Sequence, residues 1–143
     1  MRFMVLVPAN PTSEAGTLPS GDALAEMGKY NEMLVKAGVM KAGEGLHPTS
    51  KGSRVHFEKG KEPTVKDGPF TDQGLIAGYW VFECASHAEA VEWVKKAPFA
   101  SMHPDPTTIE IRRIFDPADF APSDPTGELR AKEAELRAQV ERK

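Results

Sequence analysis

The 143-residue sequence has little that would hold a metal, cross a membrane or attract a polyanion. Its single cysteine, Cys84, excludes an internal disulfide and a cysteine-rich metal site and fits a reducing compartment. The 18 basic and 21 acidic residues leave a formal net charge of −3, so no large positive field is available for nucleic acid or anionic lipid. The apolar start Phe3 to Val7 is too short for a signal peptide or a membrane span. We therefore expect a cytoplasmic protein with neither nucleic acid nor membrane as a partner.

The motifs that most directly indicate a mechanism are also missing. The sequence has no Walker loop, dinucleotide-binding glycine fingerprint, GxSxG elbow or HExxH helix. The four histidines are scattered without short ligand spacing, so we predict no metal and no cofactor; the alternative is a site made by His47, His56 and a carboxylate. Cys84 follows an apolar segment, and we interpret it as a core thiol, because nothing near it in sequence would activate a nucleophile.

The pattern of apolar residues predicts an α+β order of elements. Strands are predicted at residues 2–7, 54–58, 76–84 and 107–115, with a hairpin turn at 59–61 that returns the chain through Thr64 and Val65. One helix begins after the cap Ser20 and ends at Gly38, with a core face of Leu24, Met27, Asn31 and Leu34. A second helix begins at the capping box of Ser86 and Glu89 and stops at Pro98. Residues 8–19 are predicted to form an exposed loop.

This order is typical of a ferredoxin-like split βαβ fold, in which the helices cover one face of an antiparallel sheet. The other face then needs a cover. Residues 76–84 are apolar on both parities, as in a strand covered on both sides. We therefore predict a homodimer in which two such faces press together.

The tail has a different character and is assigned to a separate unit. Residues 1–115 form the predicted domain, and residues 116–143 form a linker and a charged helix from Glu128 to Lys143 that is opened by Asp124. The helix has three larger apolar residues, Leu129, Leu136 and Val140. It is either a solvated helix or an arm laid across the partner subunit. Alternating charges exclude a basic nucleic-acid arm.

The segment from Gly43 to His47 is the first candidate site. Gly43 and Gly45 flank the carboxylate of Glu44, and glycines allow the backbone to approach a ligand closely. Glu44 and His47 are a proton acceptor and a proton donor in the same short segment. The alternative is an ordinary bulge or turn between helix and sheet.

The turn Asp67-Gly68-Pro69-Phe70 is the second candidate. Asp accepts hydrogen bonds from the amides that follow it, Gly adopts unusual backbone angles and Pro fixes its own φ. The four residues are therefore typical of a rigid turn with an aromatic anchor. A catalytic Asp67 is the alternative interpretation.

With these residues in place, the chain resembles the YCII-related (DGPF) family of small bacterial proteins over residues 1–115. The resemblance is carried by the following motifs: Gly43-Glu44-Gly45-Leu46, Asp67-Gly68-Pro69-Phe70, Gly78-Tyr79-Trp80, Glu89-Ala90-Val91-Glu92-Trp93, Pro98 and Ile109-Glu110-Ile111-Arg112. It implies a ferredoxin-like fold that forms a dimeric α+β barrel. It also implies a pocket between sheet and helices near Glu44, His47 and Asp67, with Phe70 and Tyr79 lining it.

The functional hypothesis is a homodimer that binds a small organic molecule and transfers a proton without a cofactor, as a lyase or isomerase does. Glu44 or Asp67 would be the base and His47 the proton donor or orienting group. Gly43, Gly45, Phe70 and Tyr79 would contact the ligand. The alternative is a non-catalytic regulatory or accessory protein with the charged tail as its docking surface, so the sequence leaves open whether the protein is an enzyme.

Overall fold

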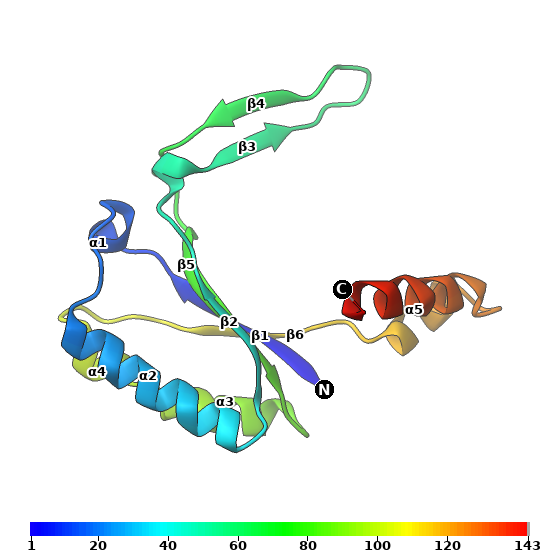
Figure 1. Ribbon diagram of the computed structural model, residues 1–143. Helices are drawn as coiled ribbons and strands as arrows, with labels where there is room; N and C mark the ends of the chain where they lie inside the picture. The colour runs from blue at the N-terminus through cyan, green and yellow to red at the C-terminus, as the bar shows by residue number, and fades with distance from the viewer. Residues whose placement is uncertain (143) are drawn as a thin grey trace.

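A four-stranded antiparallel sheet with its helices on one face forms the body of the computed structural model, which describes residues 1–142 (Figure 1). The strands are β1 (Arg2–Pro8), β2 (Met40–Gly45), β5 (Ile76–Glu83) and β6 (Glu110–Arg113), in the spatial order β2-β5-β1-β6. The helices on that face are α2 (Gly21–Lys36), α3 (His87–Lys95) and the short α4 (Phe99–Met102). The predicted ferredoxin-like order is thus confirmed, but its second strand is β2, in a segment where no strand was predicted, and β6 is shorter than expected.

The hydrophobic core lies between the sheet and these helices. Phe3, Val5, Trp80 and Phe82 alternate along β1 and β5 toward the helices and are buried, as the two-residue period of a strand requires. They pack with residues from the helices and the loop that follows α2, chiefly Tyr30, Leu34, Val39, Ala90 and Phe99.

Two hydrogen bonds satisfy the polar groups of this core. The Trp80 indole Nε1 donates to Asn31 Oδ1 at 2.9 Å, and the Tyr30 hydroxyl donates to the Trp93 carbonyl at 2.8 Å. The prediction that Leu24 belongs to the core was wrong, because its side chain is 59% exposed. At about 100° per residue, Leu24 lies roughly 80° around the helix axis from Leu34, which takes it off the buried stripe.

The predicted helix ends are confirmed by their capping contacts. Ser20 Oγ accepts a hydrogen bond from the Ala23 amide, and Gly38 takes a φ of +72° after the helix. Ser86 Oγ accepts from the Glu89 amide in the same way at the start of α3. The predicted loop at 8–19 contains one short helix, α1 (Pro11–Glu14), which the Asn10 side chain caps.

The predicted hairpin is also confirmed, but it leaves the main sheet. After the short helix η1 (Thr49–Lys51), β3 (Ser53–His56) and β4 (Thr64–Asp67) pair only with each other and project away from the body (Figure 1). Every residue of both strands is exposed. A two-stranded ribbon with no cover has little to stabilise it in water, so this hairpin presents surface that another element would bury.

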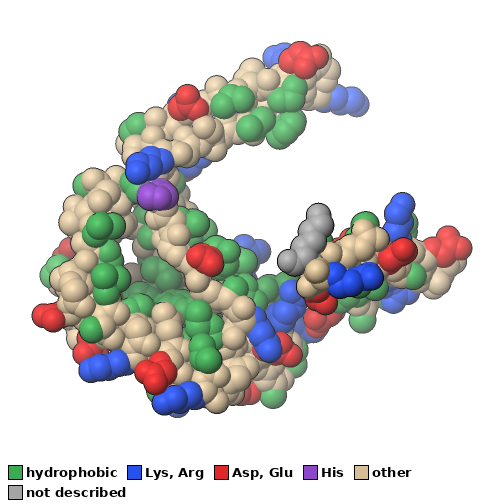
Figure 2. Space-filling view, viewed as in Figure 1, with side chains coloured by type: hydrophobic (Ala, Val, Ile, Leu, Met, Phe, Trp, Pro, Cys, Tyr) green, Lys and Arg blue, Asp and Glu red, His purple; other side chains and the backbone are tan. Residues whose placement is uncertain are grey.

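The C-terminal segment and the hairpin project from the body on opposite sides of a hollow (Figures 1 and 2). It consists of η2 (Pro117–Ser123) and α5 (Glu128–Glu141), so the predicted charged helix is present; Lys143 lies outside the described residues. The Asp124 carboxylate accepts hydrogen bonds from the Leu129 and Arg130 amides at the start of α5. The Arg130 amide, above all, lowers the pKa of Asp124. No helix within residues 1–142 is both long and apolar enough to span a bilayer.

Candidate functional site

The sheet face that points away from the helices has apolar side chains that no other element of residues 1–142 covers. Met4 pairs with Val81, and Leu6 pairs with Tyr79, so these four side chains lie together on this face, and all four are half-buried. We call this surface the open face. It lies in the hollow between the hairpin and the C-terminal segment (Figures 1 and 2).

Glu44 brings a carboxylate to the open face. It is the β2 partner of Tyr79, which in turn pairs with Leu6. The side chain is exposed, and it forms no hydrogen bond or ion pair with any residue that the structure describes. An acceptor with no internal partner therefore lies beside the residue Tyr79, with Leu6 one strand further along the sheet, and this arrangement suits a small organic ligand.

The two glycines beside Glu44 differ in their surroundings. A Cβ added to Gly43 would lie 2.6 Å from Met40 Cε and 2.8 Å from Trp80 Cδ1, so Gly43 makes room for the core on the helix side. A Cβ added to Gly45 would meet nothing within 4 Å. Gly45 points to the same side of the sheet as Gly43, opposite to Glu44, and contact with a ligand stays a prediction for both glycines.

The structure places His47 and Asp67 on other segments. His47 is exposed in the connection between β2 and η1. Asp67 ends β4, where its Oδ1 accepts a hydrogen bond of 2.7 Å from the hydroxyl of Ser53, its cross-strand partner. No hydrogen bond found in residues 1–142 joins Glu44, His47 and Asp67 to one another. Their catalytic roles stay predictions.

The turn that contains Gly68 packs closely against η1. The Gly68 amide donates to the Gly52 carbonyl at 2.9 Å, and a Cβ on Gly68 would lie 1.8 Å from the Thr49 carbonyl oxygen, so only glycine fits there. The Phe70 amide donates to Thr49 Oγ1, and the Thr49 amide donates to a carboxylate oxygen of Glu14. Sequence reasoning missed Glu14, whose partner lies 35 residues away.

Phe70 is the aromatic residue of the turn, and it lies outside the core cluster between the sheet and the helices. Its ring is buried, and the Arg54 guanidinium carbon lies 3.9 Å from the ring centroid. The same guanidinium makes two hydrogen bonds, of 2.9 and 3.0 Å, to Asp72 and lowers the pKa of that carboxyl. The buried Phe70 thus contrasts with the half-buried Tyr79, the other aromatic residue predicted to line the pocket.

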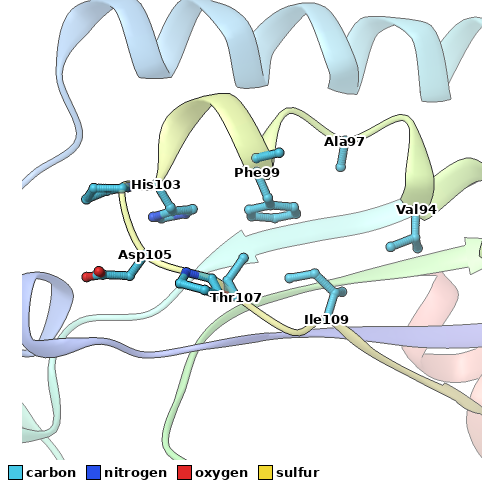
Figure 3. Close-up of a pocket in the computed structure, with 10 residues that line it drawn as sticks. Val94, Ala97, Phe99, His103, Asp105, Thr107 and Ile109 are labelled. Atoms are coloured by element: carbon cyan, nitrogen blue, oxygen red, sulfur yellow. The ribbon is translucent and has the colours of Figure 1, made fainter.

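A separate cleft of about 470 Å³ lies between α4 and the segment before β6 (Figure 3). His103 and Asp105 lie at one end of it, and Val94 and Ile109 at the other. The His103 ring stacks on Phe99 with centroids 5.8 Å apart. The signal in the sequence is the pair His103 and Asp105, two residues apart in a proline-rich loop. Nowhere in residues 1–142 do three potential metal ligands gather.

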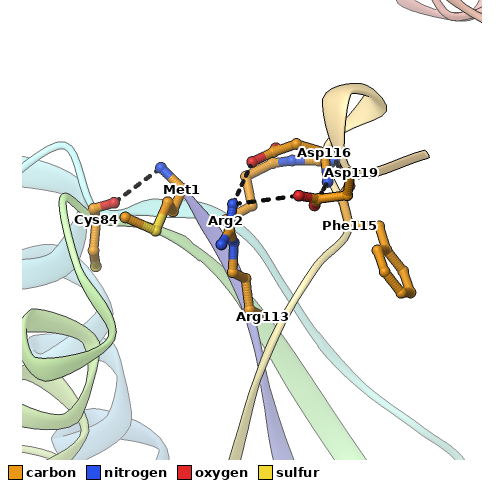
Figure 4. A network of polar contacts seen from close by, with 7 residues as sticks. All are labelled: Met1, Arg2, Cys84, Arg113, Phe115, Asp116 and Asp119. Carbon is orange, nitrogen blue, oxygen red and sulfur yellow. Dashed lines mark hydrogen bonds and ion pairs between the residues drawn. The ribbon is translucent and has the colours of Figure 1, made fainter. Parts of the chain in front are cut away.

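Cys84 lies inside the core, as interpreted from the sequence. Its side chain is 5% exposed, and burial raises the pKa of its thiol above the usual value. The N-terminal amine of Met1 donates to the Cys84 carbonyl at 3.0 Å, which ties the start of β1 to the end of β5 (Figure 4). A protonated, enclosed thiol is unsuited to nucleophilic chemistry.

Comparisons with known proteins place these features in a family. The model of the YCII-related domain matches residues 1–117. No curated protein sequence matches the chain. Among solved structures, 5-chloro-2-hydroxyhydroquinone dehydrochlorinase from Burkholderia phenoliruptrix, in complex with 2,5-dihydroxybenzoquinone, is similar at a TM-score of 0.46. It is 18% identical, and the alignment covers 80% of this chain and 94% of that one.

Proposed function

Because the chain belongs to the YCII-related domain family, we propose that it works as a homodimer in which two open faces enclose a small organic molecule. The observation that supports this most is the open face itself, where Leu6, Tyr79 and the unpartnered Glu44 lie side by side. Two such faces related by a two-fold axis would make a chamber whose centre is apolar, with Glu44, Glu110 and Arg112 from each copy toward its edges.

The chemistry that fits this chamber is cofactor-free proton transfer at a carbon next to a carbonyl group. The carbon–hydrogen bond breaks, the proton passes to the Glu44 carboxylate and the electron pair moves to the carbonyl oxygen as an enolate. His47 returns a proton or orients the substrate. Asp67 is the alternative base, and its hydrogen bond to Ser53 favours a structural role at the base of the hairpin.

Exchange of substrate hydrogen for deuterium tests this proposal without knowledge of the natural substrate. Cyclohexanone and phenylacetone, incubated with the protein in deuterium oxide, should lose their α-proton signals in the NMR spectrum faster than in buffer. Glu44→Gln keeps the shape of the side chain and removes the base, so it should return the rate to that of buffer. Asp67→Asn should retain exchange.

Light scattering and circular dichroism provide the controls. Both variants should remain folded dimers, so that a change in rate reports on the carboxylate alone. A dimer whose exchange rate is unchanged in Glu44→Gln would contradict Glu44 as the base. A wild-type protein that is monomeric at tens of micromolar would contradict the chamber itself.

A further inference from the structure

Two projecting segments flank the hollow over the open face (Figure 2). We call residues 51–67 the hairpin arm and residues 115–142 the tail arm. Both expose apolar side chains that their own chain leaves without a cover: Val55, Phe57 and Val65 on the hairpin arm, and Phe115, Phe120, Leu129, Leu136 and Val140 on the tail arm. Apolar surface of this extent, gathered on two arms around one hollow, is typical of a binding site for another protein chain.

The tail arm has a groove, and the hairpin arm has a side chain that would fill it. Between η2 and α5 lies a groove of about 470 Å³ whose apolar walls include Phe115, Phe120 and Leu129. Phe57, which follows β3 at the far end of the hairpin, is 73% exposed. An aromatic residue on a narrow ribbon is a suitable anchor for such a groove, because anchors of this kind dominate binding energies.

The charges of the two arms are complementary. The hairpin arm has five basic and three acidic residues, a net charge of +2. The tail arm, with Lys143 included, has five basic and seven acidic residues, a net charge of −2. Contact between the hairpin arm of one copy and the tail arm of another is therefore attractive, whereas contact between two hairpin arms would juxtapose like charges.

The open face of the sheet is also too small to form a stable dimer interface by itself. Four strands about 4.8 Å apart and roughly 20 Å long present a face on the order of 400 Å². A stable interface buries about 800 Å² per partner. The arms are the uncovered apolar surface that would supply the remainder.

The groove is formed before any partner arrives. Arg113 at the end of β6 contacts Asp116 at 3.1 Å and Asp119 at 3.9 Å, and the Asp116 amide donates to the Asp119 carboxylate (Figure 4). The ring centroids of Phe115 and Phe120, which both line the groove, lie 4.9 Å apart. These contacts connect the end of β6 to η2, at the point where the tail arm leaves the sheet.

We propose that in the dimer the hairpin arm of each copy docks on the tail arm of the other, with Phe57 in the groove between η2 and α5. This inference rests on the homodimer proposed above. Two equivalent contacts form, because a two-fold axis repeats each of them. The tail, which lies almost wholly beyond the residues matched by the family model, then has a role in assembly.

Disulfide trapping between two differently tagged copies tests the proposal. One copy carries Phe57→Cys and the other Leu129→Cys, and the two are co-expressed and purified through both tags. A disulfide needs Cβ atoms within about 4.5 Å, so it forms only where the arms meet. We expect mild oxidation to link most of the mixed dimer. Cys84 is buried, and the wild-type protein should give no linked species under the same conditions.

The outcomes separate this inference from the proposed function. A linked mixed dimer, with little linking in either variant alone, supports the docking of hairpin on tail. Linking by Phe57→Cys alone shows hairpin on hairpin and overturns the inference, while the homodimer stands. A dimer by light scattering that never links overturns it in the same way, and a monomer overturns both. In addition, Phe57→Ser should weaken dimerisation roughly a hundredfold, because each dimer loses two anchors; unchanged dimerisation would contradict the inference.

Discussion

The two faces of the four-stranded sheet belong to the same strands, but in a single chain one face is buried under helices and the other has no cover. Phe3, Trp80 and Phe82 point to the helices and are buried, whereas Met4, Tyr79 and Val81, their neighbours in sequence, point to the hollow and stay half-buried. The open face has an apolar centre, and it also has charged residues on its outer strands, Glu44 on β2 and Glu110 and Arg112 on β6. Stability of the single chain therefore depends on one face, and we assign the other to assembly and ligand binding.

The largest expected effect comes from neighbours on opposite faces of β5. Phe82→Ala removes a fully buried ring from the core, and we expect it to lower the free energy of unfolding by about 3–5 kcal/mol. Val81→Ala on the open face should cost about 1 kcal/mol or less. Denaturant unfolding of dilute protein measures both. Equal losses would break the comparison, because they would mean that the open face is already covered within one chain.

The glycines on either side of Glu44 give the next largest difference. Gly43→Ala forces a methyl group against Met40 and Trp80, and we expect a loss of about 1–3 kcal/mol. Gly45→Ala has open space and should change the free energy of unfolding by less than about 0.5 kcal/mol. Thermal and denaturant unfolding check this. If Gly45→Ala destabilised the protein and Gly43→Ala did not, the assignment of Gly43 as the glycine that packs against the core would be wrong.

Alkaline pH should weaken the covered face through Tyr30. Burial, and to a lesser extent the nearby Cys84, raises the pKa of the Tyr30 hydroxyl in the folded protein above its usual value of about 10. The unfolded chain loses this proton first, so it binds fewer protons than the folded chain above about pH 10, and stability falls as the pH rises. The contribution is intact below that pH, and its slope above it is at most about 1.4 kcal/mol per pH unit.

Tyr30→Phe is the control for this pH dependence. The variant lacks the ionisable hydroxyl, so its unfolding free energy should fall less steeply above about pH 10 than that of the wild type. Parallel curves for the two proteins, measured by denaturant titration at several pH values, would contradict a protonated and buried Tyr30.

The features that sequence predicted well are those set by neighbouring residues. Ser20 and Ser86 cap their helices through amides three positions later, and the apolar residues on both parities of β5 indicate a strand without knowledge of its partners. The face of the sheet on which Glu44 lies could not be predicted from neighbouring residues. It depends on Gly43 pairing with Trp80 and Glu44 with Tyr79, strands whose register is a long-range property.

The hairpin and its turn show the same limit. The hairpin was predicted from its own residues, but its departure from the main sheet depends on Gly68 lying against Thr49 and on Thr49 binding Glu14. These partners are far apart in sequence, so no local pattern indicates them. The exposed position of Leu24 has a similar cause, because which stripe of α2 is buried depends on where the sheet lies.

The smallest difference is between two tyrosines, one from each side of the sheet. Tyr30→Phe removes a buried hydrogen bond to the Trp93 carbonyl and should cost about 1 kcal/mol near neutral pH. Tyr79→Phe removes a hydroxyl that makes no hydrogen bond in residues 1–142, so its effect on unfolding should be within about 0.5 kcal/mol. If the open face binds the substrate, Tyr79→Phe should instead change the rate of α-proton exchange in the dimer. If Tyr79→Phe lowered stability and left the exchange rate unchanged, Tyr79 would contribute to folding and not to ligand binding. Both faces of the sheet would then serve to stabilise the single chain.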